Sequence, residues 1–122
     1  MKHPETTRIR RGFLPILTGC DLSRRRIPRL ELEVGPGPGI WLTACAHGDE
    51  VGGIVSVHDL FRRLARDGLK KGSIHAYPLM NPIGFDVCSR HITLSEEDLN
   101  RSFPGNPAGS LAERMAHTIF QS

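Results

Sequence analysis

The feature that most constrains the fold is an apolar run that leads directly into a helix pattern. Residues 40–46 (IWLTACA) are a short apolar run, which predicts a strand buried on both faces. From residue 50 to residue 67 the apolar residues recur every three or four positions, which predicts an amphipathic helix. Residues 29–34 and 73–81 predict further strands before and after this unit. Strands alternating with a helix indicate the α/β class.

The glycine- and proline-rich segment GPGPG (residues 35–39) predicts a turn between the first two strands. Two strands joined by so short a link are expected to be antiparallel neighbours, 29–34 beside 40–46. Upstream of them, the basic residues 1–28 are expected to form a lead-in to a domain that occupies residues 29–122.

The last third of the chain combines a long loop with a helix. Residues 82–107 are rich in Pro, Gly, Asn and Asp, which predicts a long loop of the kind that carries function. Residues 108–122 predict a helix, with Ser110 and Glu113 placed to form a capping box at its start. Since no further strand or helix follows to extend the sheet, we expect the chain to be the front part of a larger fold.

The positive charge is concentrated near the N-terminus. Residues 1–30 hold eight Lys and Arg residues against Glu5 and Asp21, whereas the whole chain has a net charge of +3. The stretch SRRRIPR (23–29) is compatible with a nucleic-acid patch. It lacks interleaved aromatic residues and any recognisable nucleic-acid-binding motif, so we expect a solvated basic edge and no nucleic-acid partner.

Composition also bears on the compartment. No apolar stretch approaches the roughly 18 residues that cross a bilayer, so no membrane association is expected. The N-terminal MKHPETTRIRR has no apolar core of a secretory signal. Three cysteines without CxxC spacing argue against a disulfide framework and for a reducing compartment. We therefore expect a cytoplasmic protein.

Two residues of metal-binding type follow the apolar run. His47 and Glu50 lie three positions apart where the predicted strand turns into the helix, and open α/β sheets bind ligands at this end of a strand. Zinc accepts imidazole nitrogen and carboxylate oxygen, and catalytic zinc sites have three protein ligands and one open position. A His-x-x-Glu pair alone is a weak pattern, so a turn histidine beside an ordinary helix-start carboxylate remains the alternative.

A second group of polar residues lies in the predicted loop. Arg90, Asn100 and Arg101 offer planar hydrogen-bond donors that suit a carboxylate. Solvated loop charges are the alternative interpretation.

Four motifs carry a resemblance to a known family. HGDE, MNPIGF, SRH and DLNRSFPG, in this order, resemble the succinylglutamate desuccinylase/aspartoacylase family of the zinc carboxypeptidase-like group, over roughly residues 40–122. The resemblance implies a partial three-layer α/β/α sandwich with a mixed sheet. It also implies Zn²⁺ as cofactor and hydrolysis of the amide bond of an N-acyl amino acid, a small-molecule substrate.

The resemblance also implies roles for individual residues. His47 and Glu50 match the first two zinc ligands of the family. Arg90 matches the arginine that stabilises the developing oxyanion. Asn100 and Arg101 match the pair that grips the α-carboxylate of the substrate.

Two parts of the family pattern are missing. The third zinc ligand, a histidine, and the glutamate that acts as general base have no counterpart in these 122 residues. His91 and Cys45 remain as substitute ligands. We therefore expect a zinc-dependent amidohydrolase in the intact parent and an inactive chain on its own. There are two alternatives, a zinc carboxypeptidase and a short non-catalytic metal- or partner-binding protein. The sequence leaves open whether the protein forms a homo-oligomer.

Overall fold

Four strands form one mixed sheet in the computed structural model, which describes residues 8–18 and 22–122. They are β1 (Arg10–Thr18), β2 (Arg24–Glu33), β3 (Gly39–Thr43) and β4 (Ser73–Tyr77), and they lie side by side in the order β1-β2-β4-β3. β1 with β2 and β2 with β4 are antiparallel, whereas β3 and β4 are parallel. The predicted α/β class with a mixed sheet is confirmed.

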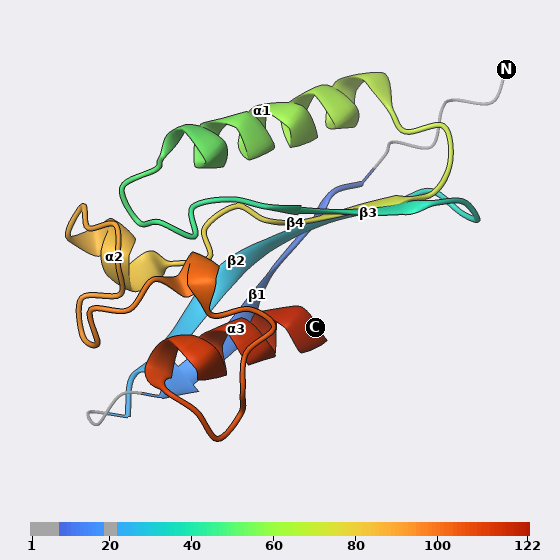
Figure 1. Cartoon of the computed structure of the whole chain (residues 1–122). Helices are drawn as coiled ribbons and strands as arrows, with labels where there is room; N and C mark the ends of the chain where they lie inside the picture. Colours follow the sequence, from blue (N-terminus) through green and yellow to red (C-terminus); the bar gives the residue numbers. More distant parts are fainter. Residues whose placement is uncertain (1–7, 19–21) are drawn as a thin grey trace, which may run out of the picture.

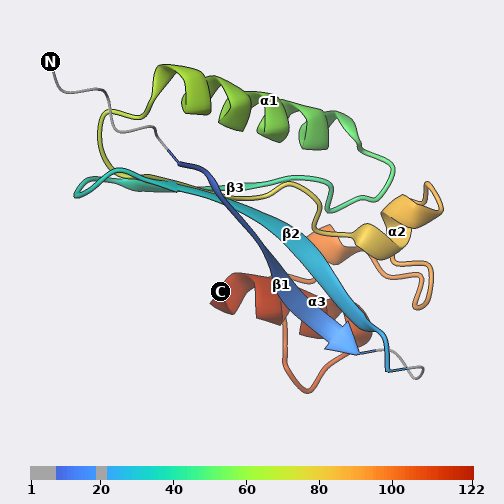
Figure 2. The same cartoon turned by 180° about the vertical axis from the view of Figure 1, so that it is seen from behind.

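Helices cover both faces of this sheet, which gives three layers (Figures 1 and 2). α1 (Gly52–Asp67) lies on one face and α3 (Leu111–Gln121) lies on the other. The predicted loop over 82–107 contains a short helix, α2 (Pro82–Asp86), and a 3₁₀ turn, η1 (Leu99–Arg101). Within the described residues, no helix combines the length and apolar character needed to cross a membrane.

The predicted pairing of strand 29–34 with strand 40–46 is wrong, because β4 lies between β2 and β3. The helical crossover from β3 through α1 returns the chain parallel to β3, and β4 then also pairs with β2. Residues 35–39 therefore pass over the start of β4 instead of closing a hairpin. The Val34 amide donates to the Gly72 carbonyl at 2.9 Å and the Ser73 amide donates to the Pro38 carbonyl at 3.0 Å.

The expectation that residues 40–46 form a strand buried on both faces is also wrong. β3 ends at Thr43 and pairs only with β4, so it is an edge strand of the described sheet. Ile40 and Trp41 are about half exposed in consequence, at 51% and 48%. The chain stays beside its neighbour beyond Thr43, because the Ala44 amide donates to the Tyr77 carbonyl at 3.0 Å.

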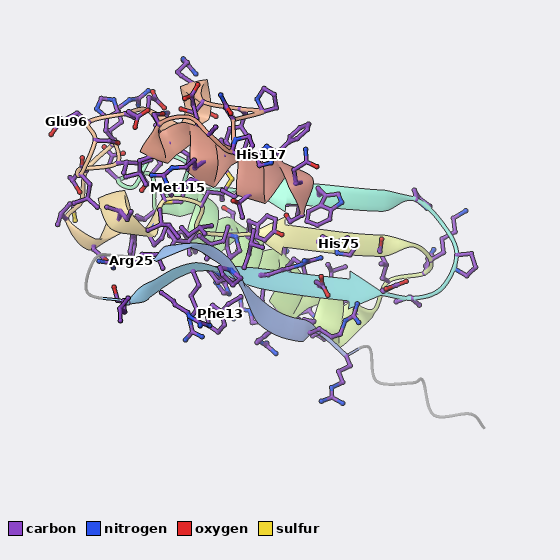
Figure 3. The ribbon with its side chains drawn as sticks, turned by 90° about the horizontal axis from the view of Figure 1, so that it is seen from below. Phe13, Arg25, His75, Glu96, Met115 and His117 are labelled. Atoms are coloured by element: carbon purple, nitrogen blue, oxygen red, sulfur yellow. The ribbon has the colours of Figure 1, made fainter. Side chains whose placement is uncertain are left out.

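Two apolar clusters lie between the sheet and the helices that pack on it. On the α1 side, Val57 and Phe61 pack with buried residues of β2 and β4, because alternate strand residues face alternate sides. The cluster on the α3 side is larger and lies under the helix whose Met115 is labelled in Figure 3. Its buried members are Ile16, Ile27, Tyr77, Met80, Ile83, Ile92, Leu99, Ala112, Met115, Ala116 and Ile119.

The predicted capping box at the start of α3 is confirmed. The Glu113 amide donates to the Ser110 hydroxyl at 3.3 Å, and the Ser110 amide donates to the Glu113 carboxylate at 2.8 Å. The Ser110 hydroxyl also donates to Glu97, a residue of the preceding loop. Burial raises the pKa of Glu97, but hydrogen bonds from the Ser110 hydroxyl and the Ala112 amide lower it by more, so the pKa lies below its ordinary value.

The N-terminal segment contributes strands that were not expected. β1 and the first residues of β2 lie within 1–28, and they pair with each other through a register that shifts between Pro15 and Leu17. The buried Ile16 and Ile27 join the cluster under α3. The domain boundary at residue 28 stays a prediction.

Candidate functional site

His47 is held in a buried turn between β3 and α1. The turn is fixed from its other side by the segment after β4, since the Asn81 amide donates to the Cys45 carbonyl at 3.0 Å. Cys45 adopts a left-handed φ of 54° and its thiol donates to the His47 carbonyl at 3.1 Å. Burial, with Glu50 and Asp49 nearby, raises the pKa of Cys45, so the thiol stays protonated.

Both nitrogens of the His47 ring contact carboxylates. Nδ1 lies 3.1 Å from Glu50 Oε1, and Nε2 lies 3.0 Å from Asp98 Oδ1. The His47 side chain is only 8% exposed. A neutral imidazole has one N–H and one lone pair, so a single proton serves only one of these contacts. The other contact needs a second proton or a cation between the nitrogen and the carboxylate.

Asp98 is the member of this cluster to which the sequence assigned no role. It precedes the 3₁₀ turn η1, where its carboxylate accepts from the Asn100 amide at 2.9 Å. Burial raises the pKa of Asp98, but the hydrogen bond and charge of His47, the Asn100 amide and Arg90 together bring it below the ordinary value. Asp98 is the first residue of DLNR, and Asp is favoured at N-cap positions. This preference is the signal in the sequence that could have indicated a fixed carboxylate here.

Arg90 comes to the same cluster from the loop after α2. Its guanidinium lies 3.7 Å from Glu50 and 3.8 Å from Asp98, so the structure brings together three of the residues singled out from sequence, His47, Glu50 and Arg90. The Gly48 amide donates to the Arg90 carbonyl at 3.3 Å, which ties the two loops together.

Gly48 and Gly84 make this approach of the two loops possible. A Cβ at Gly48 would lie 2.2 Å from the Gly84 carbonyl carbon, and a Cβ at Gly84 would lie 2.6 Å from Asn81 Nδ2. Asn81 is fully buried and accepts from the Gly84 amide at 2.9 Å. The MNPIGF motif therefore builds the wall against which the His47 turn packs.

Asn100 and Arg101 are neighbours in the chain but face different hollows. Asn100 lines a small hollow of about 360 Å³ together with His47 and Glu50. Arg101 lines a separate hollow with Glu97 and Glu113. The structure thus brings Asn100, but not Arg101, to the His47 hollow.

The donor set fits a metal ion between His47 and Glu50. Two ligands of one zinc ion at about 2.0–2.2 Å lie roughly 3.0–3.5 Å apart, and Nδ1 and Oε1 are separated by 3.1 Å. Asp98 on Nε2 would leave the Nδ1 lone pair facing Glu50, as metal-binding histidines require. Within the residues that the structure describes, no group of three or more His, Cys, Asp or Glu residues is arranged to hold a metal, so neither His91 nor Cys45 completes one.

Comparison with known proteins identifies related sequences. A family model described as the succinylglutamate desuccinylase/aspartoacylase catalytic domain matches residues 36–122. The N-alpha-acetyl-L-2,4-diaminobutyric acid deacetylase of Halomonas elongata is 34% identical over 115 residues, which cover 92% of this chain and 33% of the deacetylase. The chain therefore spans about a third of the length of this curated relative.

Comparison with solved structures identifies proteins that share the fold of this chain. An aspartoacylase family protein from Mesorhizobium loti matches with a TM-score of 0.84 and 29% identity, covering 96% of this chain and 37% of that protein. A metallo-carboxypeptidase from Burkholderia cenocepacia matches with a TM-score of 0.70 at 18% identity, covering 96% of this chain and 33% of that protein. The second likeness shows a shared fold with a carboxypeptidase, in agreement with the predicted carboxypeptidase-like architecture.

Proposed function

The chain belongs to the succinylglutamate desuccinylase/aspartoacylase family, and on this premise we propose that it supplies the metal-binding part of an active site that hydrolyses the amide bond of an N-acyl amino acid. The related Halomonas elongata protein is named as a deacetylase of an N-acetyl amino acid, which supports this substrate class. The chain spans a third of that relative, and in this proposal the activity would be that of a longer protein to which these residues contribute.

The observation that carries the proposal is the placement of His47 between two carboxylates. Glu50 on Nδ1 would share a zinc ion with His47, and Asp98 on Nε2 would hold the ring orientation and tautomer. A bound zinc ion supplies a polarised water of lowered pKa for attack on an amide carbonyl. Asp98 is therefore a positioning residue in this proposal, and His47 and Glu50 are the metal ligands.

The other residues of the cluster would act on the substrate. Arg90 carries a guanidinium beside Glu50, where it would stabilise negative charge that develops on the carbonyl oxygen. Asn100 lines the same hollow as His47 and would hold the α-carboxylate. Arg101 would share this role only after its side chain turns away from the hollow that it lines with Glu97 and Glu113.

A zinc titration of the 122-residue chain tests the metal pair. We expect one zinc per chain, with an affinity that falls at least about tenfold in His47→Ala, since one of the protein ligands is lost. His58→Ala is the matched control, because His58 is exposed on α1 and makes none of the contacts described for His47. Equal zinc affinity in His47→Ala and the native chain would contradict the site.

A chimera tests the reaction itself. The chain replaces the matching third of the Halomonas elongata deacetylase, and the product is assayed with N-acetyl amino acids. We expect hydrolysis that chelators abolish and that His47→Ala in the chimera also abolishes. A folded chimera that binds zinc and cleaves no N-acyl amino acid would contradict the proposed activity.

A further inference from the structure

The guanidinium of Arg90 and the ring of His47 lie against the same oxygen atom of Glu50. This oxygen, Oε1, is 3.1 Å from His47 Nδ1 and 3.7 Å from Arg90 Nη1. The other terminal nitrogen of the guanidinium, Nη2, lies 3.8 Å from Asp98 Oδ2, while Asp98 Oδ1 contacts His47 Nε2. Arg90 therefore bridges the two carboxylates that flank His47 and brings a positive charge to the proposed metal pair.

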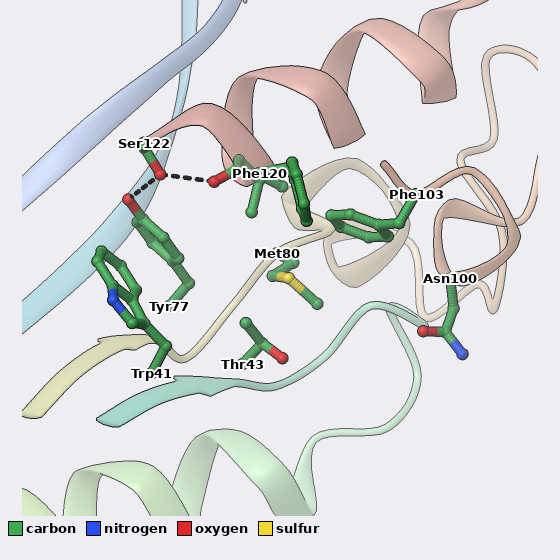
Figure 4. A pocket seen from close by; sticks show the side chains of 9 residues that line it. Trp41, Thr43, Tyr77, Met80, Asn100, Phe103, Phe120 and Ser122 are labelled. Atoms are coloured by element: carbon green, nitrogen blue, oxygen red, sulfur yellow. Dashed lines mark hydrogen bonds between the residues drawn. The ribbon is translucent and has the colours of Figure 1, made fainter. Parts of the chain in front are cut away.

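Arg90 is the basic side chain that faces these carboxylates. In residues 8–18 and 22–122, no other Lys or Arg side chain forms an ion pair with Glu50 or Asp98. The polar side chains of the His47 hollow that Figure 4 labels, Thr43 and Asn100, are uncharged. A cation beside His47 is thus attracted by two carboxylates and repelled by one guanidinium.

The Arg90 side chain contributes little to holding the carboxylates in place. Both of its ion-pair distances exceed a hydrogen-bond length, its side chain is 48% exposed and that of Glu50 is 60% exposed, and exposed pairs of this kind add little stability. Asp98 is held independently, by the Asn100 amide at 2.9 Å and by His47 at 3.0 Å. The loop itself is tied down through the Arg90 carbonyl, which a change of side chain leaves in place.

The charge of Arg90 acts against a metal at the same oxygen. Zinc–carboxylate bonds measure about 2.0–2.2 Å, so an ion bonded to Glu50 Oε1 would lie within about 6 Å of Arg90 Nη1. Coulomb repulsion between charges of +2 and +1 at this separation in water, screened by about 0.1 M salt, corresponds to about threefold to tenfold in affinity. Because the positioning contribution of Arg90 is small, the repulsion decides the sign of its effect.

We infer that Arg90 lowers the affinity of the His47–Glu50 pair for zinc, because its guanidinium competes with the metal for the charge of Glu50. The inference rests on the proposed function, in which this pair holds zinc, and it adds to the role of Arg90 at the carbonyl oxygen. It assigns opposite effects to two neighbours of the pair. Loss of Asp98 weakens zinc binding, whereas loss of the Arg90 charge tightens it.

Competition with a chromophoric chelator measures the zinc affinity of the 122-residue chain and its variants. Arg90→Gln removes the charge and keeps a polar side chain at this half-exposed position, so the variant should fold. We expect it to bind zinc about threefold to tenfold more tightly than the native chain in about 0.1 M salt. Arg90→Lys keeps the charge, so its zinc affinity should stay within about twofold of the native value.

Arg25→Gln is the matched control. The Arg25 side chain is 47% exposed and its guanidinium lies 3.8 Å from Asp86, whose side chain is 60% exposed, so this ion pair nearly equals the Arg90–Glu50 pair in length and exposure. Arg25 lies on β2 (labelled in Figure 3) and has no printed contact with His47 or Glu50 among the ion pairs described above. Arg25→Gln changes the net charge of the chain by the same amount, and its zinc affinity should equal that of the native chain.

Salt separates an effect of charge from a change in the shape of the loop. The Debye length falls from about 10 Å at 0.1 M to about 3 Å at 1 M, which is shorter than the separation of the two cations. The ratio of the zinc affinities of Arg90→Gln and the native chain should therefore fall below about twofold in about 1 M salt. A ratio that stays the same would mean that the loop has rearranged, and would overturn the inference.

Other outcomes would overturn it as well. Equal or weaker zinc binding in Arg90→Gln would show that the guanidinium holds the ligands in place and does not repel the metal. Equal tightening in Arg90→Lys or in Arg25→Gln would exclude the local charge as the cause. His47→Ala in the same assay keeps this test distinct from that of the proposed function. If His47→Ala weakens zinc binding and Arg90→Gln does not tighten it, the metal pair stands and only the competition is refuted, whereas unchanged affinity in His47→Ala would refute both.

Discussion

A single methyl group at Gly48 should disrupt the site through the backbone. A Cβ there would lie 2.2 Å from the Gly84 carbonyl carbon, 2.3 Å from the Phe85 nitrogen and 2.5 Å from the Ser89 oxygen. All three are main-chain atoms, so no side-chain rotation relieves the clash and the two loops must separate. Gly48 does not have the left-handed φ that favours glycine, so the penalty of Gly48→Ala is steric.

The size of the effect follows from these distances. Overpacking a well-fitted interior contact costs about 1–3 kcal/mol. Since three main-chain contacts are violated at once, we expect a loss of about 3 kcal/mol in the free energy of unfolding. For a chain of this length, about 4 °C of melting temperature corresponds to 1 kcal/mol, so the melting temperature should fall by about 12 °C.

Circular dichroism during thermal and urea unfolding measures this loss. Gly52→Ala is the matched control four residues away, because a Cβ at Gly52 meets nothing within 4 Å. Gly52 begins α1, so alanine there should leave the stability unchanged or raise it by up to about 1 kcal/mol. If Gly48→Ala melts within about 2 °C of the native chain, the two loops separate without the expected loss in the free energy of unfolding, which would refute the steric explanation.

Three further changes test other parts of the structure. Asp98→Ala should lower zinc affinity about tenfold to a hundredfold through loss of the His47 contact, measured by competition with a chelator; an unchanged affinity would contradict its positioning role. The pKa of Glu97 is lowered in the folded state, so its carboxylate stabilises the fold above its unfolded pKa of about 4.3, and this contribution disappears as the pH falls through the folded value. Urea unfolding of Glu97→Gln should therefore show lower stability at pH 7 and a smaller loss on acidification than the native chain, and parallel pH profiles would refute this. Met115→Ala at a fully buried position should cost about 2–5 kcal/mol in urea unfolding, and a loss below about 1 kcal/mol would contradict the packing under α3.

Features that depend on short-range patterns were predictable from the sequence. The helix over residues 50–67 and the capping box of Ser110 and Glu113 are confirmed, because helix periodicity and capping involve residues a few positions apart. The family could also be identified, since its motifs and their order can be read from the sequence without knowledge of the fold.

The approach of Arg90 to His47 and Glu50 could be predicted only through that resemblance. His47 and Glu50 meet because they are three residues apart on one turn. Arg90 is forty residues further along, and no local pattern places its guanidinium beside Glu50. The roles of these residues stay predictions that the zinc titration and the chimera test.

The order of the strands was decided only by the tertiary structure. A short link between β2 and β3 suggested a hairpin, but β4 pairs with both of them and lies between them. Likewise, Asp98 reaches Nε2 of His47 across 51 positions of sequence, and Asn100 and its neighbour Arg101 line different hollows.

The sequence by itself determined α1, α3, the capping box of α3 and the motifs, because these follow from the chemistry and spacing of residues close together in the chain. The tertiary structure alone decided which strands are neighbours and which carboxylate lies against the second nitrogen of His47. Those features arise from packing between distant segments, whose energies depend on the whole fold and leave no periodic trace in the sequence.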